Sequence, residues 1–220
     1  SRVLVELRPS LAADKLVIAA AASFGGGDET GLLTAGTMFL GSDFTEFGVG
    51  SPLAFAASGT HRTVLNGTGA QNINFNVPGK ATSHFQDLEI QNTSAPVTLQ
   101  TSVFANGQLI MLNTPINYTI QSLGQVLTVG GTNISAGTGE AVFDSTQVVI
   151  SSSGGPITSF SKVHFIRMSP TVVQPPVSPP GIVGVQVGLG GVEFDTPPTS
   201  GPSLNAIDDQ GIWPATHSLN

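Results

Sequence analysis

The feature that most constrains the fold of this chain is a recurrence of short apolar segments, separated by turn-forming residues, through its middle. Successive segments begin 21, 17, 22 and 15 residues apart, and their starts are Leu88, Leu109, Val126, Val148 and Val163. One coil of a β-solenoid, which stacks its strands on those of the coil before, has about this length. Pairs of strands in a β-sandwich would recur at a similar interval. The period therefore predicts an all-β fold and leaves these two architectures open.

The scarcity of charge bears on that choice. Only 10% of the residues are charged, and 7 basic residues stand against 14 acidic ones, for a formal net charge of −7. In stacked coils like residues lie above one another, which ladders of Ser, Thr, Asn and Gln tolerate and like charges do not. The low charge therefore favours the solenoid, with the sandwich as the alternative. So few basic residues also exclude a nucleic-acid-binding surface.

Two further absences narrow the function classes. The chain has no cysteine, which excludes disulfides, thiolate zinc sites and cysteine nucleophiles. The longest apolar run extends from Leu16 to Ala22, whereas a helix that crosses a membrane needs about 20 apolar residues. The sequence therefore predicts no transmembrane segment.

Alternation of apolar and polar residues predicts individual strands. In 71–77, Ile73, Phe75 and Val77 share one face and three asparagines share the other. Helix signals are scarce. The best candidate is residues 9–22, with Ser10 as a possible N-cap, and a strand over Lys15–Ala19 competes with it. Further strands are predicted at Thr37–Leu40, His61–Leu65, 96–99, 116–120 and 141–143.

Changes of composition divide the chain into four parts. Residues 1–14 form a strand-like N-terminal extension, and 15–173 carry the repeated strands. The segment 174–180 contains four prolines, which predicts an extended linker. Residues 181–220 form a C-terminal extension with a predicted strand at 182–189.

A series of short phrases stands in a fixed order along the middle of the chain. The phrase Ser58 to Gln71 is preceded by Leu33-Thr34-Ala35-Gly36-Thr37 and by Gly41-Ser42-Asp43-Phe44. It is followed by two strand phrases, Phe85 to Thr93 and Val97 to Val103. This series resembles the phrases of bacterial secreted β-strand-repeat surface proteins, which are adhesin-like.

This resemblance covers about residues 32–174. It implies an exported protein of the cell surface, built of stacked strands in a β-helix-like arrangement. Export in turn implies that a leader is removed before Ser1. The resemblance says little about the ligand, and the family's members are usually much longer than this chain.

Some β-helices cleave polysaccharides, and that chemistry needs two carboxyl groups about 5–9.5 Å apart. Asp87 and Glu89 are two residues apart, so in a strand they share a face. The simpler interpretation is a solvated strand face opposite a core of Leu88 and Ile90. The chain also has only one Trp and one Tyr on which a sugar could stack. A carbohydrate-binding or carbohydrate-cleaving β-helix is therefore the alternative function, and we expect no catalytic residues and no enzyme.

Metal and cofactor motifs are weak. The four histidines, His61, His84, His164 and His217, are isolated from one another in the sequence. Gly25 to Glu29 faintly resembles a calcium loop but is not repeated. No P-loop, nucleophile elbow or dinucleotide fingerprint is present. We therefore predict no metal and no cofactor.

The leading hypothesis is a non-enzymatic, extracellular structural or adhesive protein that assembles with copies of itself into a fibre or layer. Strand-like segments stand at both ends of the chain, and either could add to the open sheet edge of a neighbour. The residues predicted to form these segments are Val3, Val5 and Leu7 at one end and Val183, Val185, Val187 and Leu189 at the other. The predicted partners are other copies of the chain, with a surface glycan as a second possibility.

Overall fold

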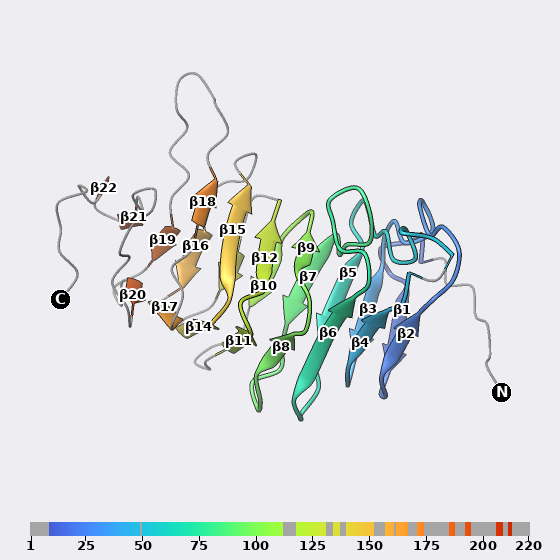
Figure 1. The fold of residues 1–220 in the computed structure, drawn as a ribbon, viewed down its shortest axis with the longest axis horizontal. Helices are drawn as coiled ribbons and strands as arrows, with labels where there is room; N and C mark the ends of the chain where they lie inside the picture. Colours follow the sequence, from blue (N-terminus) through green and yellow to red (C-terminus); the bar gives the residue numbers. More distant parts are fainter. Residues whose placement is uncertain are drawn as a thin grey trace, which may run out of the picture.

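The structure is a computed structural model. It describes residues 9–48, 50–111, 118–130, 134–136, 140–151, 157–160, 162–166, 171–173, 185–187, 192–194, 206–208 and 211–212. These residues form strands and turns without a helix, and the strands belong to three sheets. Figure 1 shows strands of successive coils side by side along the long axis, from the blue N-terminal end to the red C-terminal end.

Sheet 1 and sheet 2 run the length of the stack, and sheet 3 lies in its later part. Sheet 1 has the order β1 (Lys15–Ile18), β3 (Thr37–Leu40), β5 (Arg62–Leu65), β7 (Asp87–Ile90), β10 (Leu109–Met111), β13 (Ile134–Ala136), β16 (Ile157–Phe160), β19 (Val185–Val187), β21 (Ala206–Asp208), β22 (Gly211–Ile212). Sheet 2 has the order β2 (Ala22–Phe24), β4 (Phe44–Glu46), β6 (Gln71–Phe75), β8 (Val97–Leu99), β11 (Tyr118–Ser122), β14 (Glu140–Asp144), β17 (Lys162–Ile166), β20 (Val192–Phe194). Sheet 3 has the order β9 (Val103–Ala105), β12 (Val126–Val129), β15 (Gln147–Ser151), β18 (Thr171–Val173).

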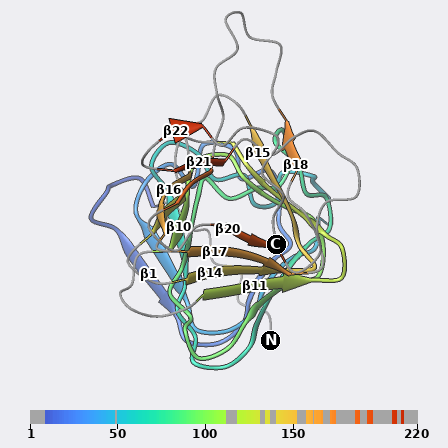
Figure 2. The same ribbon diagram turned by 90° about the vertical axis from the view of Figure 1, so that its left-hand side faces the viewer.

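The pairing identifies the architecture as a β-solenoid. Neighbouring strands are parallel, apart from the antiparallel pair β21–β22. Thr37 lies opposite Arg62, and Arg62 lies opposite Asp87, so equivalent positions of successive coils stack directly on one another. Viewed along the axis in Figure 2, the strands enclose a three-sided outline. The prediction of a solenoid is confirmed, and the sandwich alternative is wrong because parallel neighbours one coil apart do not form hairpins.

The apolar rhythm in the sequence mixes the three sheets. Leu88 pairs with Leu109 in sheet 1, so the interval between these two residues is one coil. Likewise Leu127 pairs with Val148 in sheet 3. The two shorter intervals, which end at Val126 and Val163, are steps from one sheet to another, because Val126 belongs to sheet 3 and Val163 to sheet 2.

The helix suggested for residues 9–22 does not form. Instead, Asp14 Oδ2 accepts hydrogen bonds from the backbone N–H groups of Ser10 and Leu11, at 3.0 and 2.9 Å, and closes a turn. The chain then enters β1, whose four residues pair in register with β3. The strand interpretation is correct here because parallel pairing and core contacts outweigh the helical preference of the alanines that follow.

Before β9, the third side of the outline is built from stacked loops. The backbone N–H of Glu29 donates to Leu53 O, and that of His84 donates to Phe55 O. Phe85 then forms a parallel bridge with Ala105, the last residue of β9. The loops of the early coils therefore continue, without strands, the side that sheet 3 occupies later.

Most side chains in the described part of the interior are apolar, and their composition changes along the axis. Early coils bury a cluster of aromatic rings around Phe44, which lies 4.9 Å from Phe55, Phe75 and Phe85 between ring centroids. Later coils bury mainly Val, Leu, Ile and Ala side chains. The predicted alternation in 71–77 is confirmed where Ile73 and Phe75 are buried and Asn74 is exposed.

A buried amide pair closes the corner between sheets 1 and 2. Gln71 is fully buried; its Nε2 donates to Leu40 O and Ser42 O, at 2.9 and 2.8 Å. Its Oε1 accepts from the Gly67 N–H and from Asn92 Nδ2. One side chain therefore links three consecutive coils.

Candidate functional site

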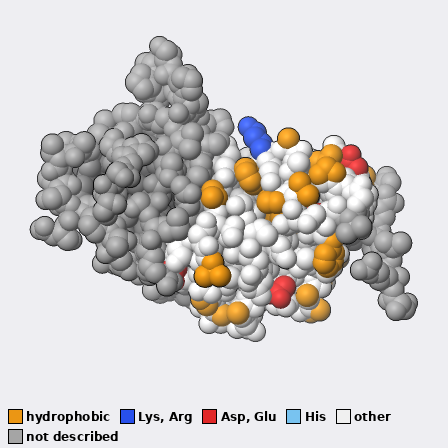
Figure 3. Space-filling view, in the orientation of Figure 1, with side chains coloured by type: hydrophobic (Ala, Val, Ile, Leu, Met, Phe, Trp, Pro, Cys, Tyr) orange, Lys and Arg blue, Asp and Glu red, His pale blue; other side chains and the backbone are white. Residues whose placement is uncertain are grey.

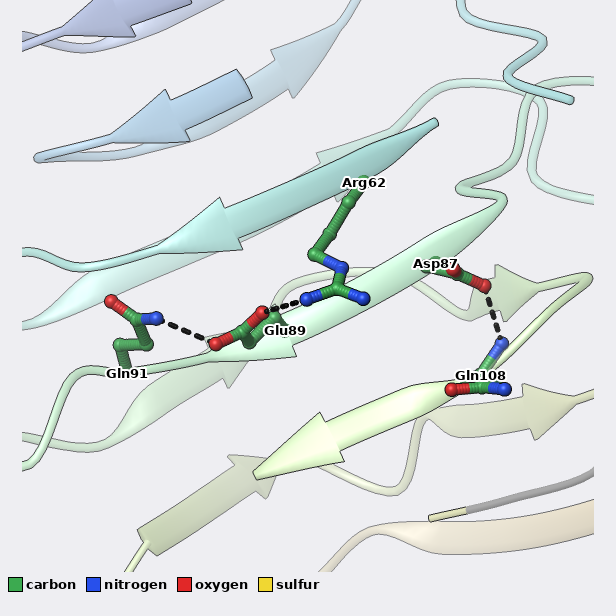
Figure 4. A network of polar contacts seen from close by, with 5 residues as sticks. All are labelled: Arg62, Asp87, Glu89, Gln91 and Gln108. Atoms are coloured by element: carbon green, nitrogen blue, oxygen red, sulfur yellow. Dashed lines mark hydrogen bonds and ion pairs between the residues drawn. The ribbon is translucent and has the colours of Figure 1, made fainter. Parts of the chain in front are cut away.

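The two carboxylates singled out from the sequence lie on the outer face of β7, as Figure 4 shows. Glu89 is nevertheless only 3% exposed. Its Oε2 accepts from Arg62 Nη1 at 3.0 Å and its Oε1 from Gln91 Nε2 at 2.5 Å. In register, it stands between Val64 and Ile110, which are also buried. The expected solvated face is therefore wrong for Glu89, because neighbouring long side chains cover it.

Asp87 forms a hydrogen bond with the backbone of the next coil. Its Oδ1 accepts from the backbone N–H of Gln108 at 2.9 Å, in the next coil. A methyl group on Gly107 would collide with the same oxygen. Both carboxylates thus hold coils together through hydrogen bonds. Glycoside hydrolysis needs one carboxyl to give a proton and the other to attack or activate water, so this pair gives that chemistry little support.

Two acidic residues of β4 and its approach also accept hydrogen bonds from the backbone. Asp43 Oδ1 accepts from the Asn72 N–H at 2.8 Å. Glu46 is 1% exposed, and its Oε2 accepts from the N–H groups of Asn76 and Val77. Because Glu46 is buried, these two acids do not form an exposed pair. Asp208 lies in β21, opposite Gly211.

His61 is more deeply buried than His84. Its ring is fully buried, and with Nδ1 assigned as protonated it donates to Ala35 O at 2.9 Å. Burial lowers the pKa of His61, against the opposing effects of the Ala35 hydrogen bond and the charge of Asp87. Its Nε2 has no hydrogen-bond partner. An imidazole in this position is held neutral.

Nothing within the described part of the chain gathers three or more His, Asp and Glu side chains that could hold a metal ion. His84 Nδ1 bonds to Thr82 O, and His164 stands opposite Val142 in β14. In the glycine-rich segment, hydrogen bonds from Thr30, first by its side chain and then by its N–H to Asp28 Oδ1, lower the pKa of Asp28. The segment is therefore a turn closed by its own aspartate. His217 and Trp213 lie outside the described residues.

The terminal segments predicted to exchange between copies are described only in part. Val3, Val5, Leu7, Val183 and Leu189 lie outside the described residues. Val185 and Val187 lie in β19, which pairs with β16 and β21 of the same chain. Strand β16, which precedes the proline-rich segment 174–180, and β19, which follows it, thus belong to one sheet.

The N-terminal end of the stack is a second candidate surface, which the sequence did not point to. β1 and β2 stand at the ends of sheets 1 and 2, and the described residues place no strand beyond them. Asp14 O and Ile18 O accept from Thr37 and Gly41 of the next coil. The alternate backbone groups, those of Lys15 and Val17, therefore point away from β3.

Apolar side chains accompany this open edge. Leu16, Ile18 and Phe24 pack against the core but are only partly buried. Val17 and Leu11 are 70% and 66% exposed. An edge of this kind is normally protected by charges, prolines or a covering strand, and β1 itself carries one charge, Lys15. That lack of protection was the signal available in the sequence.

Comparisons of the chain with family models, with curated proteins and with solved structures return no match. The described residues contain no helix long and apolar enough to cross a membrane.

Proposed function

We propose that this chain is a non-enzymatic structural protein of the cell exterior, which assembles with copies of itself by adding a strand to the open edge of its first coil. The observation that carries the proposal is the end of the stack at β1 and β2. There, the backbone groups of Lys15 and Val17 have no partner among the described residues, and they lie beside partly buried apolar side chains. A strand of a second copy would form hydrogen bonds with these backbone groups and cover these apolar side chains.

The segment that donates the added strand can be inferred from which terminal segments already pair within their own chain. Residues 185–187 pair on both sides within their own chain. The N-terminal segment with Val3, Val5 and Leu7 is therefore the better donor of the two predicted from the sequence. Its apolar face would cover Leu16 and Ile18. Addition of identical units in one direction extends into a fibre where the rotation does not close.

The exterior location is supported by the low charge of the chain and by its resemblance to secreted β-strand-repeat proteins. A fibre or surface layer of stacked strands needs many equivalent, weakly charged faces, and this chain supplies them. Adhesion to a surface glycan would be compatible with such a structural role.

Val17 offers a direct test of the edge. Because its N–H points away from β3, Val17→Pro removes a donor from the free edge and leaves the β1–β3 ladder intact. Val17→Thr keeps the N–H and the branched side chain, and serves as the matched control. We expect filaments by negative-stain electron microscopy for the natural chain and for Val17→Thr, and particles of the 22.5 kDa monomer for Val17→Pro.

Removal of residues 1–8 tests the donor separately. We expect the shortened chain to remain monomeric by light scattering, and to be incorporated at one end of filaments formed by the natural chain. Uniform monomers of the natural chain at all concentrations would overturn the proposed self-assembly. Filaments of Val17→Pro would overturn the β1 edge as the contact.

A further inference from the structure

The outer faces of sheets 1 and 2 differ in charge. In the first coils, sheet 1 presents Lys15, Arg62, Asp87 and Glu89 on its outer face. Strands β2, β4, β6, β8 and β11 of sheet 2 contain a single charged residue, Glu46, which is buried on the inner side. The outer face of these strands therefore carries amides and hydroxyls and no basic residue, with Asp43, just before β4, and Asp144, in register with Gln121, at its borders.

Amides and hydroxyls occupy this face, and hydrogen bonds between coils hold them in place. Gln100 Nε2 donates to Asn72 Oδ1 at 2.9 Å, and Gln121 Nε2 donates to Thr98 Oγ1 at 2.8 Å. Asn72 Nδ2 in turn donates to Asp43 Oδ1. Each amide thus points toward the coil before it. Side chains fixed in this way lose little freedom when a ligand binds.

The amides retain unused hydrogen-bonding capacity. A primary amide offers two donors and two acceptor sites, and each inter-coil bond uses one of them. Asn74, on the same face of β6, is exposed. Because the strands are parallel and in register, these groups recur at the spacing of the coils, about 4.8 Å. The face is a regular array of neutral donors and acceptors.

An exposed aromatic ring adjoins the array. Phe47 directly follows β4 and is 43% exposed. Its backbone N–H donates to Phe24 O, which fixes its place above the preceding coil. A methyl group on Gly25 would lie 3.3 Å from the Phe47 ring, so the ring rests beside backbone that carries no side chain. Asn76, which follows Asn74 on the same face, is exposed as well.

We propose that the outer face of sheet 2, from Phe47 along the Asn72–Gln100 and Thr98–Gln121 ladders, binds a neutral polysaccharide. A sugar ring has apolar C–H groups that pack on an aromatic face and hydroxyls that both donate and accept. Phe47 supplies the aromatic face for the C–H groups, and the amides supply donors and acceptors for the hydroxyls. Small-molecule sites typically combine these two kinds of contact. A polymer that contacts several coils gains from multivalency, since each contact after the first is intramolecular.

The charge of the face selects among polymers. An array without basic residues, bordered by Asp43 and Asp144, offers no compensation for the desolvation of carboxylates or sulfates on a polyanion. The described surface visible in Figure 3 carries few charged side chains, acidic ones among them, and apolar side chains in small groups. The proposal is independent of self-assembly, because it uses neither β1 nor the first-coil edge.

Retention on insoluble cellulose and chitin, together with affinity electrophoresis in mannan and in alginate, tests this site with the full chain. We expect retention by at least one neutral polymer and none by alginate. Phe47→Ala should weaken binding by about tenfold, as truncation of an aromatic anchor does. Leu11→Ala removes a 66% exposed side chain from the turn before β1, outside sheet 2, and should leave binding unchanged.

A charge placed in the array gives a second test that does not endanger the fold. Asn74→Asp puts a carboxylate among the amides and should also weaken binding, whereas Asn66→Asp, at an exposed turn after β5, should not. Thermal melting checks that each variant is folded. The proposal is overturned if no neutral polymer retains the natural chain, or if Phe47→Ala and Asn74→Asp bind as their controls do. Retention on alginate equal to that on the neutral polymers would also overturn it.

Discussion

The coils formed by residues 22–90 and those formed by residues 97–146 fill the same three-sided outline in different ways. The early coils have loops on their third side, and five phenylalanines centred on Phe44 fill the interior. The later coils have a regular third sheet, and their interior is mainly aliphatic. Phe55 and Phe85 come from the loop side and reach the rings of sheet 2. Large rings thus take over the contacts that a third strand would otherwise make.

The difference extends to polar groups in the interior. All four buried side-chain atoms without a hydrogen-bond partner among the described residues lie in the early coils, on Glu46, His61, Thr63 and Thr82. In the later coils, Ser122 and Thr146 bond to each other and to the backbone at their corner. Irregular backbone therefore comes with less complete polar satisfaction, and the early coils should be the more sensitive to substitution and to pH.

Truncation at the centre of the ring cluster should have the largest effect. Phe44→Ala removes a ring that contacts four others and leaves a cavity that the surrounding coils cannot fill. We expect a loss of about 3–5 kcal/mol in the free energy of unfolding. Urea denaturation followed by circular dichroism measures it.

Leu127→Ala, at a fully buried position of β12, is the matched truncation in the later coils. If Leu127→Ala lowers the urea midpoint more than Phe44→Ala does, the aromatic cluster is not what holds the early coils together. A separate early transition in Phe44→Ala would show that the two regions unfold independently, as expected for stacked units.

The corner amide should come next. Gln71→Ala leaves Ser42 O and the Gly67 N–H without this partner inside the stack, while Leu40 O keeps the Asn66 N–H. Because buried polar groups without partners are costly, we expect a loss of about 1–3 kcal/mol. Gln71→Glu is the more informative companion, since it keeps Oε1 for Gly67 but loses the two donated bonds. A Gln71→Ala midpoint equal to that of the natural chain would contradict the role assigned to this corner.

Much of the fold follows from sequence pattern. Alternation located β6 to within two residues, and β-branched residues located β1 against a competing helix, because both signals depend only on neighbours in the chain. The burial of Glu89 and Gln71 could not be predicted, because it depends on Arg62 and Asn92, one coil away. The third side of the early coils also escaped prediction, because its loops carry no periodic pattern.

For the candidate surfaces too, local sequence features could be predicted and contacts between coils could not. Asp87 and Glu89 were recognised as a pair on one strand face, but their hydrogen-bond partners come from adjacent coils. The exposed position of Phe47 depends on Gly25, in the preceding coil. Contacts between coils cannot be predicted from a local sequence pattern unless the coil length is known, and the coil length is not constant. In sheet 1, the coil from Thr63 to Leu88 is longer than the coil that follows it, from Leu88 to Leu109.

Acidification should affect the early coils first. Burial lowers the pKa of His61 below its ordinary value of 6.5, so the unfolded chain binds a proton at a higher pH than the folded chain does. The stabilising effect of the neutral imidazole is complete above pH 6.5 and is lost as the pH falls below it. The slope can reach about 1.4 kcal/mol per pH unit. Residues 97–146 contain no histidine, so this loss belongs to the early coils.

Thermal melting between pH 7.5 and pH 5.5 measures the effect, and His61→Gln supplies the comparison. We expect the melting temperature of the natural chain to fall across this range and that of His61→Gln to change less. Equal slopes for the two proteins would mean that other groups, and not His61, set the pH response.

The smallest effect should come from the ion pair on the outer face. Arg62→Ala removes one of the two donors to Glu89, while Gln91 Nε2 remains. The Arg62 side chain is 39% exposed, so solvent screens the pair and we expect a loss of no more than about 1 kcal/mol. The natural chain should approach the variant in stability as salt is raised from 0.05 to about 1 M, because salt screens the exposed Arg62 side of the pair and leaves the Gln91 bond unchanged. A loss several times larger, insensitive to salt, would instead mean that Glu89 is an unpaired buried charge in the variant, and that the outer face of sheet 1 depends on Arg62 as strongly as the interior depends on Phe44.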